Sequence, residues 1–262
     1  MTPISFVSLP NEMILQIASD TDDSSLLSLI LCSRSLYNLL EPVLDIRAMA
    51  PRGDLSAMQW AAVRGYLGLV HRLIMHDVHP DTGATDTEPP AVRHAVEARN
   101  LQMVELLIIF GADINSLSYK ICGNEAVIHV AAANGDSDMI ELLVSYGANI
   151  SANLDEIYDR TPLYVAVWNG HVSAVQTLLE LGADVYEDGD SELLVEIAES
   201  VACSEVGATG LWDRMAKIGE LLVQAGADVR EVSSSDRFPD APRNVEFLGI
   251  MVAAQQRATW GA

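Results

Sequence analysis

Positively charged residues are scarce in this sequence: 15 Lys and Arg stand against 37 Asp and Glu, giving a formal net charge of −22. The imbalance is steep between residues 88 and 200, where four basic side chains face 19 acidic ones. Binding to nucleic acid needs clustered Lys and Arg, because the phosphates must be neutralised. The charge therefore argues against a nucleic-acid partner and allows, without requiring, a basic protein partner.

Cysteine is rare, and the sequence shows neither a long apolar run nor the pattern of a secretory leader. Cys32, Cys122 and Cys203 lie far apart and are odd in number, so they make neither a disulfide framework nor a zinc motif. No apolar run reaches the roughly 18 residues that cross a bilayer, and no basic segment followed by an apolar block opens the chain. We expect a cytoplasmic or nuclear protein without membrane contact.

Motifs of enzyme chemistry are absent as well. The sequence has no Gly-rich phosphate loop, no Gly-x-Ser-x-Gly motif and no cysteine with nearby histidines. His71, His76 and His79 form the densest histidine group, but residues five apart on a helix do not share a face. A metal site needs three or four converging ligands. We expect no catalytic residue, cofactor or metal, and an enzyme is the least favoured class.

One short pattern is repeated instead. GADI stands at 111–114, GANI at 147–150, and GADV at both 182–185 and 226–229, so the spacings are 36, 35 and 44 residues. An apolar stripe at helical spacing precedes each glycine, and glycine readily takes the left-handed conformation that ends a helix. A period of this size predicts a solenoid built from a small helical unit.

A second turn lies inside the unit. Gly135 and Gly170 stand twelve residues before Gly147 and Gly182, and the short segments AVIHVAAAN and TPLYVAVWN precede them. Thr161 can cap the second of these segments as a helix, and a proline next to it suits the first turn. The predicted unit is a helix, a tight turn, a second helix and a reversing loop.

The segment DRTPLYVAVWNGHVSAVQTLLELGADV (159–185) resembles the ankyrin repeat nearly throughout. Residues 125–150 match next best, residues 89–114 place Arg99 at the inter-helix glycine, and residues 56–78 place Asp77 at the terminal glycine. A fifth copy has its first helix at 191–202 and its second at 211–226. The resemblance implies an all-α ankyrin-repeat solenoid of about five helix-turn-helix units over 51–230, with a loop and a C-terminal capping helix over 231–262.

Residues 1–50 do not follow this period. The segment SLPNEMILQIASDTDDSSLLSLILCSRSLYNLLEPVL (8–44) resembles an F-box, although Leu36 and Tyr37 stand where many F-boxes carry Trp and more basic residues. F-box followed by ankyrin repeats is the order of a large group of fungal proteins. The resemblance implies that Leu9, Pro10 and Ile14 meet a Skp-type adaptor of a cullin ubiquitin ligase. A helical cap on the first repeat is the alternative.

Partner-binding residues follow from the ankyrin pattern, in which the two residues before the inter-helix glycine point into a concave groove. These include Asn134, Trp168 and Asn169, and the loop tips add Tyr119, Tyr158, Arg160 and Tyr186. Trp, Tyr and Arg are the residue types that concentrate binding energy, so Trp168 is the expected anchor. Packing of Trp168 on the adjacent repeat is the alternative.

Three functions remain open from sequence alone. The first is a substrate receptor of a Skp-cullin-F-box ubiquitin ligase, a monomer outside its complex, whose ankyrin groove binds a protein substrate. The second is an ankyrin scaffold without a ligase role. The third is an enzyme or small-molecule binder that uses the groove as a pocket, which would need converging polar groups.

Overall fold

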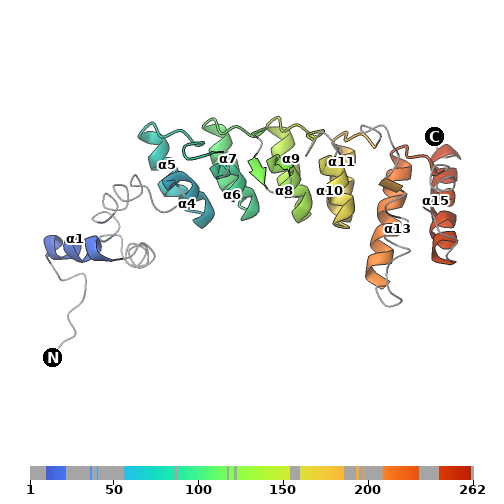
Figure 1. Cartoon of the computed structure of the whole chain (residues 1–262), viewed down its shortest axis with the longest axis horizontal. Helices are drawn as coiled ribbons and strands as arrows, with labels where there is room; N and C mark the ends of the chain where they lie inside the picture. Colours follow the sequence, from blue (N-terminus) through green and yellow to red (C-terminus); the bar gives the residue numbers. More distant parts are fainter. Residues whose placement is uncertain are drawn as a thin grey trace, which may run out of the picture.

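A row of helix pairs forms most of the computed structural model of the chain (Figure 1). The structure describes residues 10–21, 36, 40, 56–85, 88–116, 118–120, 123–153, 160–185, 193–194, 197, 209–229 and 242–260. Eight of the described helices make four consecutive pairs. Their bounds are α4 (Ala57–Arg64) with α5 (Leu67–Met75), α6 (Ala91–Glu97) with α7 (Leu101–Ile109), α8 (Val127–Asn134) with α9 (Ser137–Ser145), and α10 (Pro162–Trp168) with α11 (Val172–Glu180).

The C-terminal part holds two longer helices, α13 (Thr209–Gln224) and α15 (Pro242–Trp260). They overlap the segments expected at 211–226 and for the terminal helix. The two helices pack closely, since a Cβ added at Gly219 would come 2.6 Å from the sulfur of Met251. Phe247, Met251 and Ala254 of α15 are buried. In the first helix expected for the fifth unit, three described positions are helical and buried, namely Leu193, Leu194 and Ile197.

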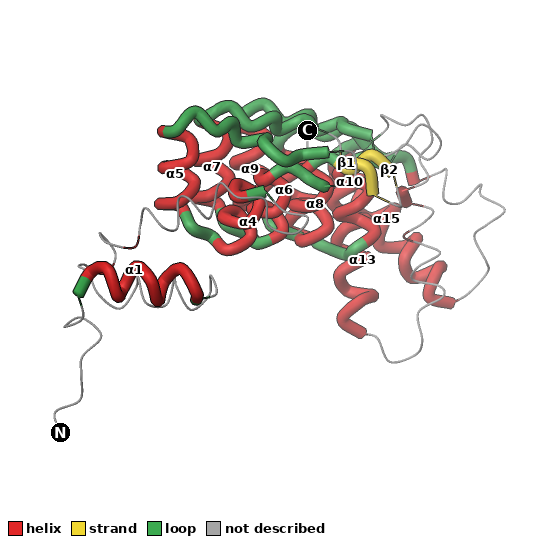
Figure 2. The backbone as a smooth tube through the Cα atoms, turned by 60° about the vertical axis from the view of Figure 1, so that its left-hand side comes forward, coloured by secondary structure: helices red, strands yellow, loops and turns green. Residues whose placement is uncertain are grey.

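The N-terminal helix α1 (Asn11–Asp20) lies at the end of the row that carries α4 (Figures 1 and 2). It begins directly after Pro10, inside the F-box-like segment. Ile14 and Ala18, four residues apart, are buried, as are Leu36 and Leu40. Most of the remaining F-box-like segment lies outside the described residues.

A short β-hairpin interrupts the helical fold between α7 and α8 (Figure 2). Strands β1 (Ser118–Lys120) and β2 (Gly123–Glu125) are antiparallel, with Ser118 opposite Glu125 and Lys120 opposite Gly123. The expectation of an all-α fold therefore holds for the described residues except for this loop-tip hairpin. Helical periodicity cannot reveal strands of three residues, because period-two alternation needs a longer run to be seen.

Left-handed backbone marks the turns, as the repeat predicts. Gly135 and Gly170 have φ of 67° and 70°, and Gly147 and Gly182 have φ of 90° and 94°. At two turns the repeat has another residue in place of glycine, and the backbone is still left-handed: φ is 61° at Asp77 and 54° at Arg99. The backbone of the repeat is thus preserved where its glycine is replaced. This conformation is unfavourable for any residue that has a Cβ atom.

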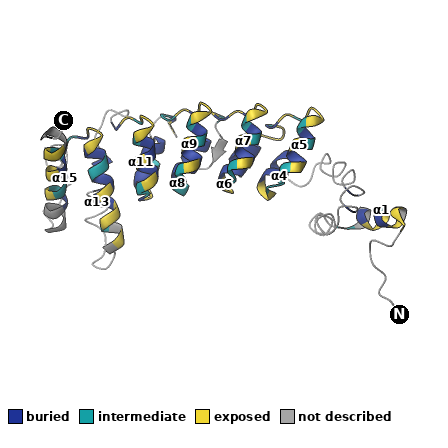
Figure 3. Ribbon diagram, turned by 180° about the vertical axis from the view of Figure 1, so that it is seen from behind, coloured by how far each residue is buried: buried dark blue, intermediate teal, exposed yellow. Residues whose placement is uncertain are grey.

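The core runs between the helices along the whole row (Figure 3). Alanines at equivalent positions of the first helices are fully buried, and they let neighbouring helices approach: Ala61, Ala95, Ala131 and Ala166. Larger apolar residues of the second helices fill the other side, among them Leu73, Leu107, Leu143 and Leu178. Within the described residues no helix combines the length and the apolar character needed to span a bilayer.

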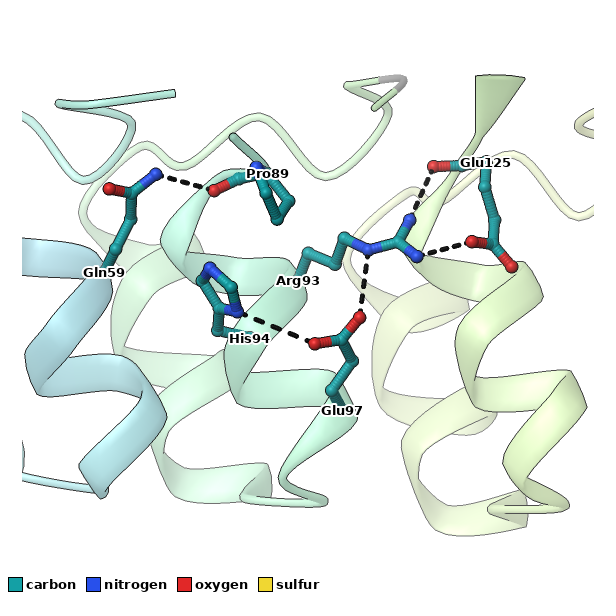
Figure 4. A network of polar contacts seen from close by, with 6 residues as sticks. All are labelled: Gln59, Pro89, Arg93, His94, Glu97 and Glu125. Carbon is teal, nitrogen blue, oxygen red and sulfur yellow. Dashed lines mark hydrogen bonds and ion pairs between the residues drawn. The ribbon is translucent and has the colours of Figure 1, made fainter. Parts of the chain in front are cut away.

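Polar side chains at one position of the first helices link each repeat to the next. Gln59 of α4 is fully buried, and its Nε2 donates to the carbonyls of Gly83 (3.0 Å) and Pro89 (2.8 Å). Arg93 of α6 is 2% exposed; it pairs with Glu97 of its own helix at 3.2 Å and with Glu125 at the end of β2 (Figure 4). Arg93 thereby fastens the hairpin to the preceding repeat.

His129 occupies the same position in α8. Its Nε2 lies 2.9 Å from the carbonyl oxygen of Ala152 and 3.1 Å from that of Arg160, so this nitrogen carries the proton and donates to both. Burial lowers the pKa of His129 below its usual value, because a buried imidazolium loses its hydration. These two hydrogen bonds give His129 a structural role in holding the segment that follows α9.

Candidate functional site

An exposed aromatic group lies on α10, and we call Arg160, Tyr164 and Trp168 the aromatic patch. Trp168 is 66% exposed, so it does not pack in the inter-repeat core. Its ring stacks on that of Tyr164, with centroids 6.3 Å apart and planes at 9°. The guanidinium carbon of Arg160 lies 5.9 Å from the Tyr164 ring centroid, within cation–π range. The patch offers a flat aromatic surface with a cation at one edge.

Local sequence explains this arrangement. The hydroxyl of Thr161 accepts from the backbone N–H of Tyr164 at 3.2 Å, and Pro162 occupies the first turn, so α10 starts at a fixed point. Tyr164 and Trp168 are four residues apart and therefore share a face. The half-buried Tyr164 supports Trp168 from below, which limits the rotamers of the exposed ring before any partner arrives.

The two asparagines predicted beside Trp168 have different surroundings. The side-chain amide of Asn169 donates to the carbonyl of Val165 at 2.8 Å, so it helps to end α10. The carbonyl of Asn134 accepts from the Arg99 guanidinium of the preceding repeat, and the neighbouring carbonyl of Ala133 lies 2.9 Å from Nε2 of His171 in the following repeat. Asn134 thus lies at a junction of three repeats.

The other predicted partner residues either lie elsewhere in the fold or fall outside the described residues. Tyr119 is in β1, between the second and third pairs, and its side chain lies outside what the structure describes, as do Leu9, Tyr158 and Tyr186. Pro10 is exposed ahead of α1, whereas Ile14 is buried. On α1 the exposed apolar side chains are Met13 (50%) and Ile17 (37%), which the sequence prediction did not select.

Tyr164 is the patch residue that sequence reasoning missed. The signal was nevertheless present, because Arg160, Tyr164 and Trp168 follow one another at intervals of four. Residues at this spacing line one face of a helix and its entry, so an aromatic residue four before an expected anchor belongs to the same surface.

A hollow elsewhere in the molecule bears on the pocket hypothesis. A groove of about 470 Å³ lies between α13 and α15, lined by Trp212, Ile250 and the Arg257–Glu220 ion pair among others. It is open to solvent and lies at the other end of the row from α4, not at Trp168. Among the described residues no group of three His, Cys, Asp or Glu side chains could hold a metal ion.

Known proteins share the repeats. A family model described as ankyrin repeats, three copies, matches residues 92–188. The chain is 32% identical over 123 residues to ankyrin repeat protein nuc-2 of Neurospora crassa. This alignment covers 47% of the chain and 11% of nuc-2. It is 33% identical over 156 residues to human ankyrin repeat and SOCS box protein 6, covering 54% of this chain and 34% of that protein.

A third relative is the probable E3 ubiquitin-protein ligase XBOS32 of Oryza sativa, 28% identical over 163 residues, with 52% of this chain and 32% of the relative covered. The chain thus spans about a third or less of the length of these relatives. The family match covers the pairs from α6 to α11, with the left-handed turns in the places that the repeat requires. The chain contains ankyrin repeats, a module whose general role is protein–protein interaction.

Proposed function

We propose that the chain is a substrate receptor for ubiquitin ligation, with the first-helix face of its ankyrin repeats holding a protein substrate. The observation that supports substrate binding is the exposure of Trp168, whose side chain is 66% exposed while its ring stacks on that of Tyr164. An exposed Trp contributes little to folding, while a desolvated one at an interface can contribute about 2 kcal/mol or more. In this scheme the array has five units, residues 191–226 forming the last.

The ligase half rests on the F-box-like segment. Helix α1 starts after Pro10 and buries Ile14, as the amphipathic pattern of the segment requires, and it leaves Met13 and Ile17 exposed. A Skp-type adaptor would cover these side chains. One relative is named as a probable E3 ubiquitin-protein ligase, and another as an ankyrin repeat and SOCS box protein, so similar repeats occur in a protein named for ubiquitin ligation. The fungal F-box and ankyrin order is consistent with this scheme.

Function follows from proximity. The adaptor would bring the ligase to residues 1–50, and the repeats would hold the substrate beside it, so the chain selects the substrate and the ligase supplies the chemistry. No residue of this chain needs to react. A cytoplasmic or nuclear monomer that joins its complex through two separate surfaces is the expected form.

The adaptor half is tested by titrating the purified full chain with a purified Skp-type adaptor in a calorimeter. We expect binding by the wild-type chain and its loss in the Leu9→Ala, Pro10→Ala double variant. Trp168→Ala is the control and should bind the adaptor normally. A wild-type chain without affinity for the adaptor would replace the ligase role by the plain scaffold role.

The substrate half is tested by affinity purification with quantitative mass spectrometry from cells of the source organism. Trp168→Ala should lose a protein that wild type and Val63→Ala both retain, since Val63 is 42% exposed on the same face of the first repeat. For the identified protein, Trp168→Ala should weaken binding about 30-fold. Unchanged affinity would remove the aromatic patch as the substrate site.

A further inference from the structure

A row of exposed apolar side chains also lies at the ends of the second helices of the repeats. We call Ile109, Phe110, Tyr146 and Leu181 the outer row; their exposed fractions are 60%, 39%, 38% and 38%. The last three occupy one equivalent position, the C-cap of α7, α9 and α11, directly before a left-handed glycine. Single exposed apolar residues are ordinary, but recurrence at one position of successive repeats makes a continuous surface.

Contacts between repeats show that the row is continuous. The hydroxyl of Tyr146 on the third pair lies 3.2 Å from a carboxylate oxygen of Glu105 on the second, and it donates to that oxygen. The Phe110 ring meets His71 of the first pair edge-on at 6.2 Å. At the C-cap position the neighbouring units carry His76 and Ala225, so large apolar side chains at this position are confined to three repeats. Figure 3 shows the second helices side by side, in the order α5, α7, α9 and α11.

Charge on the same helices has one sign. Helices α7, α9 and α11 hold Glu105, Asp138, Glu141 and Glu180, all exposed, and no Lys or Arg. The first helices differ, because Arg64 and Arg93 belong to them and Arg160 flanks α10. The outer row is therefore an apolar strip on helices whose charged side chains are all acidic, and it favours a ligand that is apolar on one side and basic on the other.

We propose that the outer row binds a basic amphipathic helix presented by a partner protein. Apolar residues of that helix would cover Ile109, Phe110, Tyr146 and Leu181, and its Lys or Arg residues would meet Glu105, Glu141 and Glu180. Neighbouring helices pack about 8–10 Å apart, so three repeats span about 20 Å, which a helix of about 14 residues covers. This surface is separate from the aromatic patch and does not depend on the ligase role.

Charge makes a second copy of the chain an unfavourable occupant. A symmetric dimer through the outer row would place the acidic helices of one copy against those of the other, and like charges brought together across an interface are repulsive. A basic ligand removes that repulsion. Its affinity should fall as salt is added, because the acidic side chains are exposed and screened.

The test uses a fluorescein-labelled 18-residue peptide of leucine and lysine, arranged so that its helix has one apolar and one basic face. Fluorescence anisotropy with the full chain gives the Kd. We expect binding that the Ile109→Ser, Leu181→Ser double variant weakens by about tenfold or more, and Glu141→Lys by a similar factor. These residues are exposed, so the variants should fold, and circular dichroism melts check this.

Matched controls separate this surface from general attraction to an acidic protein. Asp213→Lys changes the net charge as much as Glu141→Lys does, but on α13, and it should raise Kd less than about threefold. Trp168→Ala should leave Kd unchanged. Equal binding of a scrambled peptide, or equal effects of Asp213→Lys and Glu141→Lys, would overturn the proposal. So would a larger effect of Trp168→Ala, or a dimer in sedimentation that Ile109→Ser dissociates.

Discussion

The second and third helix pairs follow the same backbone path, but they carry different residues at the turn between their helices and at the position that links them to the next repeat. The third pair, α8 with α9, carries glycine at both turns and His129 at the linking position. The second pair, α6 with α7, carries Arg99 at a left-handed turn and Arg93 at the linking position. The comparison shows that the repeat requires a particular backbone path and a polar contact to the next unit. Different residue types can satisfy each of these requirements.

The space around the turn explains why one pair needs glycine and the other tolerates arginine. A Cβ at Gly135 would lie 2.6 Å from Nδ1 of His171, whose ring leans over the turn from the next repeat. At the equivalent place beside Arg99 the next repeat has Asp136, a smaller residue whose carboxylate caps α9 at the N–H of Met139. The constraint on a turn residue therefore comes from the following unit as well as from its own φ.

Removal of the buried arginine should give the largest effect in this comparison. Arg93→Ala leaves Glu97 and Glu125 without their common partner, and we expect a loss of about 3 kcal/mol in unfolding free energy. This is the low end for a broken buried pair, because Glu97 and Glu125 are 38% and 25% exposed and can be rehydrated. Urea melts measure it. A loss below about 1 kcal/mol would show that the hairpin is held by other contacts.

The inter-helix glycine of the third pair comes next. Gly135→Ala should cost about 2 kcal/mol, since it combines a left-handed Cβ with the contact to His171. Gly147→Ala is the matched control, with φ of 90° but open space around the new Cβ, and should cost about 1 kcal/mol. Equal losses in thermal melts would mean that the His171 ring simply moves aside.

Acid should destabilise the third pair through His129. Burial lowers its folded pKa below the usual 6.5, so the unfolded chain binds more protons in the window beneath that value. Stability from this residue is complete above about pH 6.5 and is lost as the pH falls toward the folded pKa. Urea melts at pH 7.5 and 5.5 should show a smaller loss in His129→Gln, which copies Gln59 of the first pair. An equal pH dependence in both proteins would assign it to the carboxylates.

The smallest effect should be a gain in unfolding free energy at the turns where Asp77 and Arg99 replace glycine. Asp77→Gly relieves a left-handed aspartate and should add about 0.5–1 kcal/mol, part of the relief being offset by the greater freedom of glycine in the unfolded chain. Arg99→Gly should be nearly neutral, because it also removes the hydrogen bond to the carbonyl of Asn134. Denaturation midpoints distinguish the two. An unfavourable Asp77→Gly would contradict the strain at residue 77.

Sequence reasoning was most successful where one rule decided the outcome. Periodicity and glycine spacing placed the helix pairs, and they identified Arg99 and Asp77 as turn residues because a turn needs left-handed backbone whatever residue occupies it. The hairpin at 118–125 was missed because its register depends on Arg93 holding Glu125 from another repeat. Contacts between units more than 30 residues apart leave no periodic trace.

The candidate site was only partly predictable for the same reason. Trp168 was found because its position in the repeat fixes its exposure. Tyr164 was not, since its stacking on Trp168 depends on two rotamers rather than on the pattern. The outer row was missed because each of its residues ends an apolar helical stripe, and periodicity alone does not show which of these side chains stay exposed. Exposure, which separates the two cases, depends on how the neighbouring repeat is placed.

The end of α8 has a consequence for the motions of the array. The carbonyl of Asn134 accepts from the guanidinium of Arg99 on one side, and the carbonyl of Ala133 lies 2.9 Å from Nε2 of His171 on the other. The third pair therefore cannot loosen without breaking contact with both neighbours, so opening anywhere between α6 and α11 exposes several units at once. The hydrogen-bonded amide protons of helices α6 to α11 should then exchange with solvent deuterium at a common slow rate, as one unit that opens cooperatively.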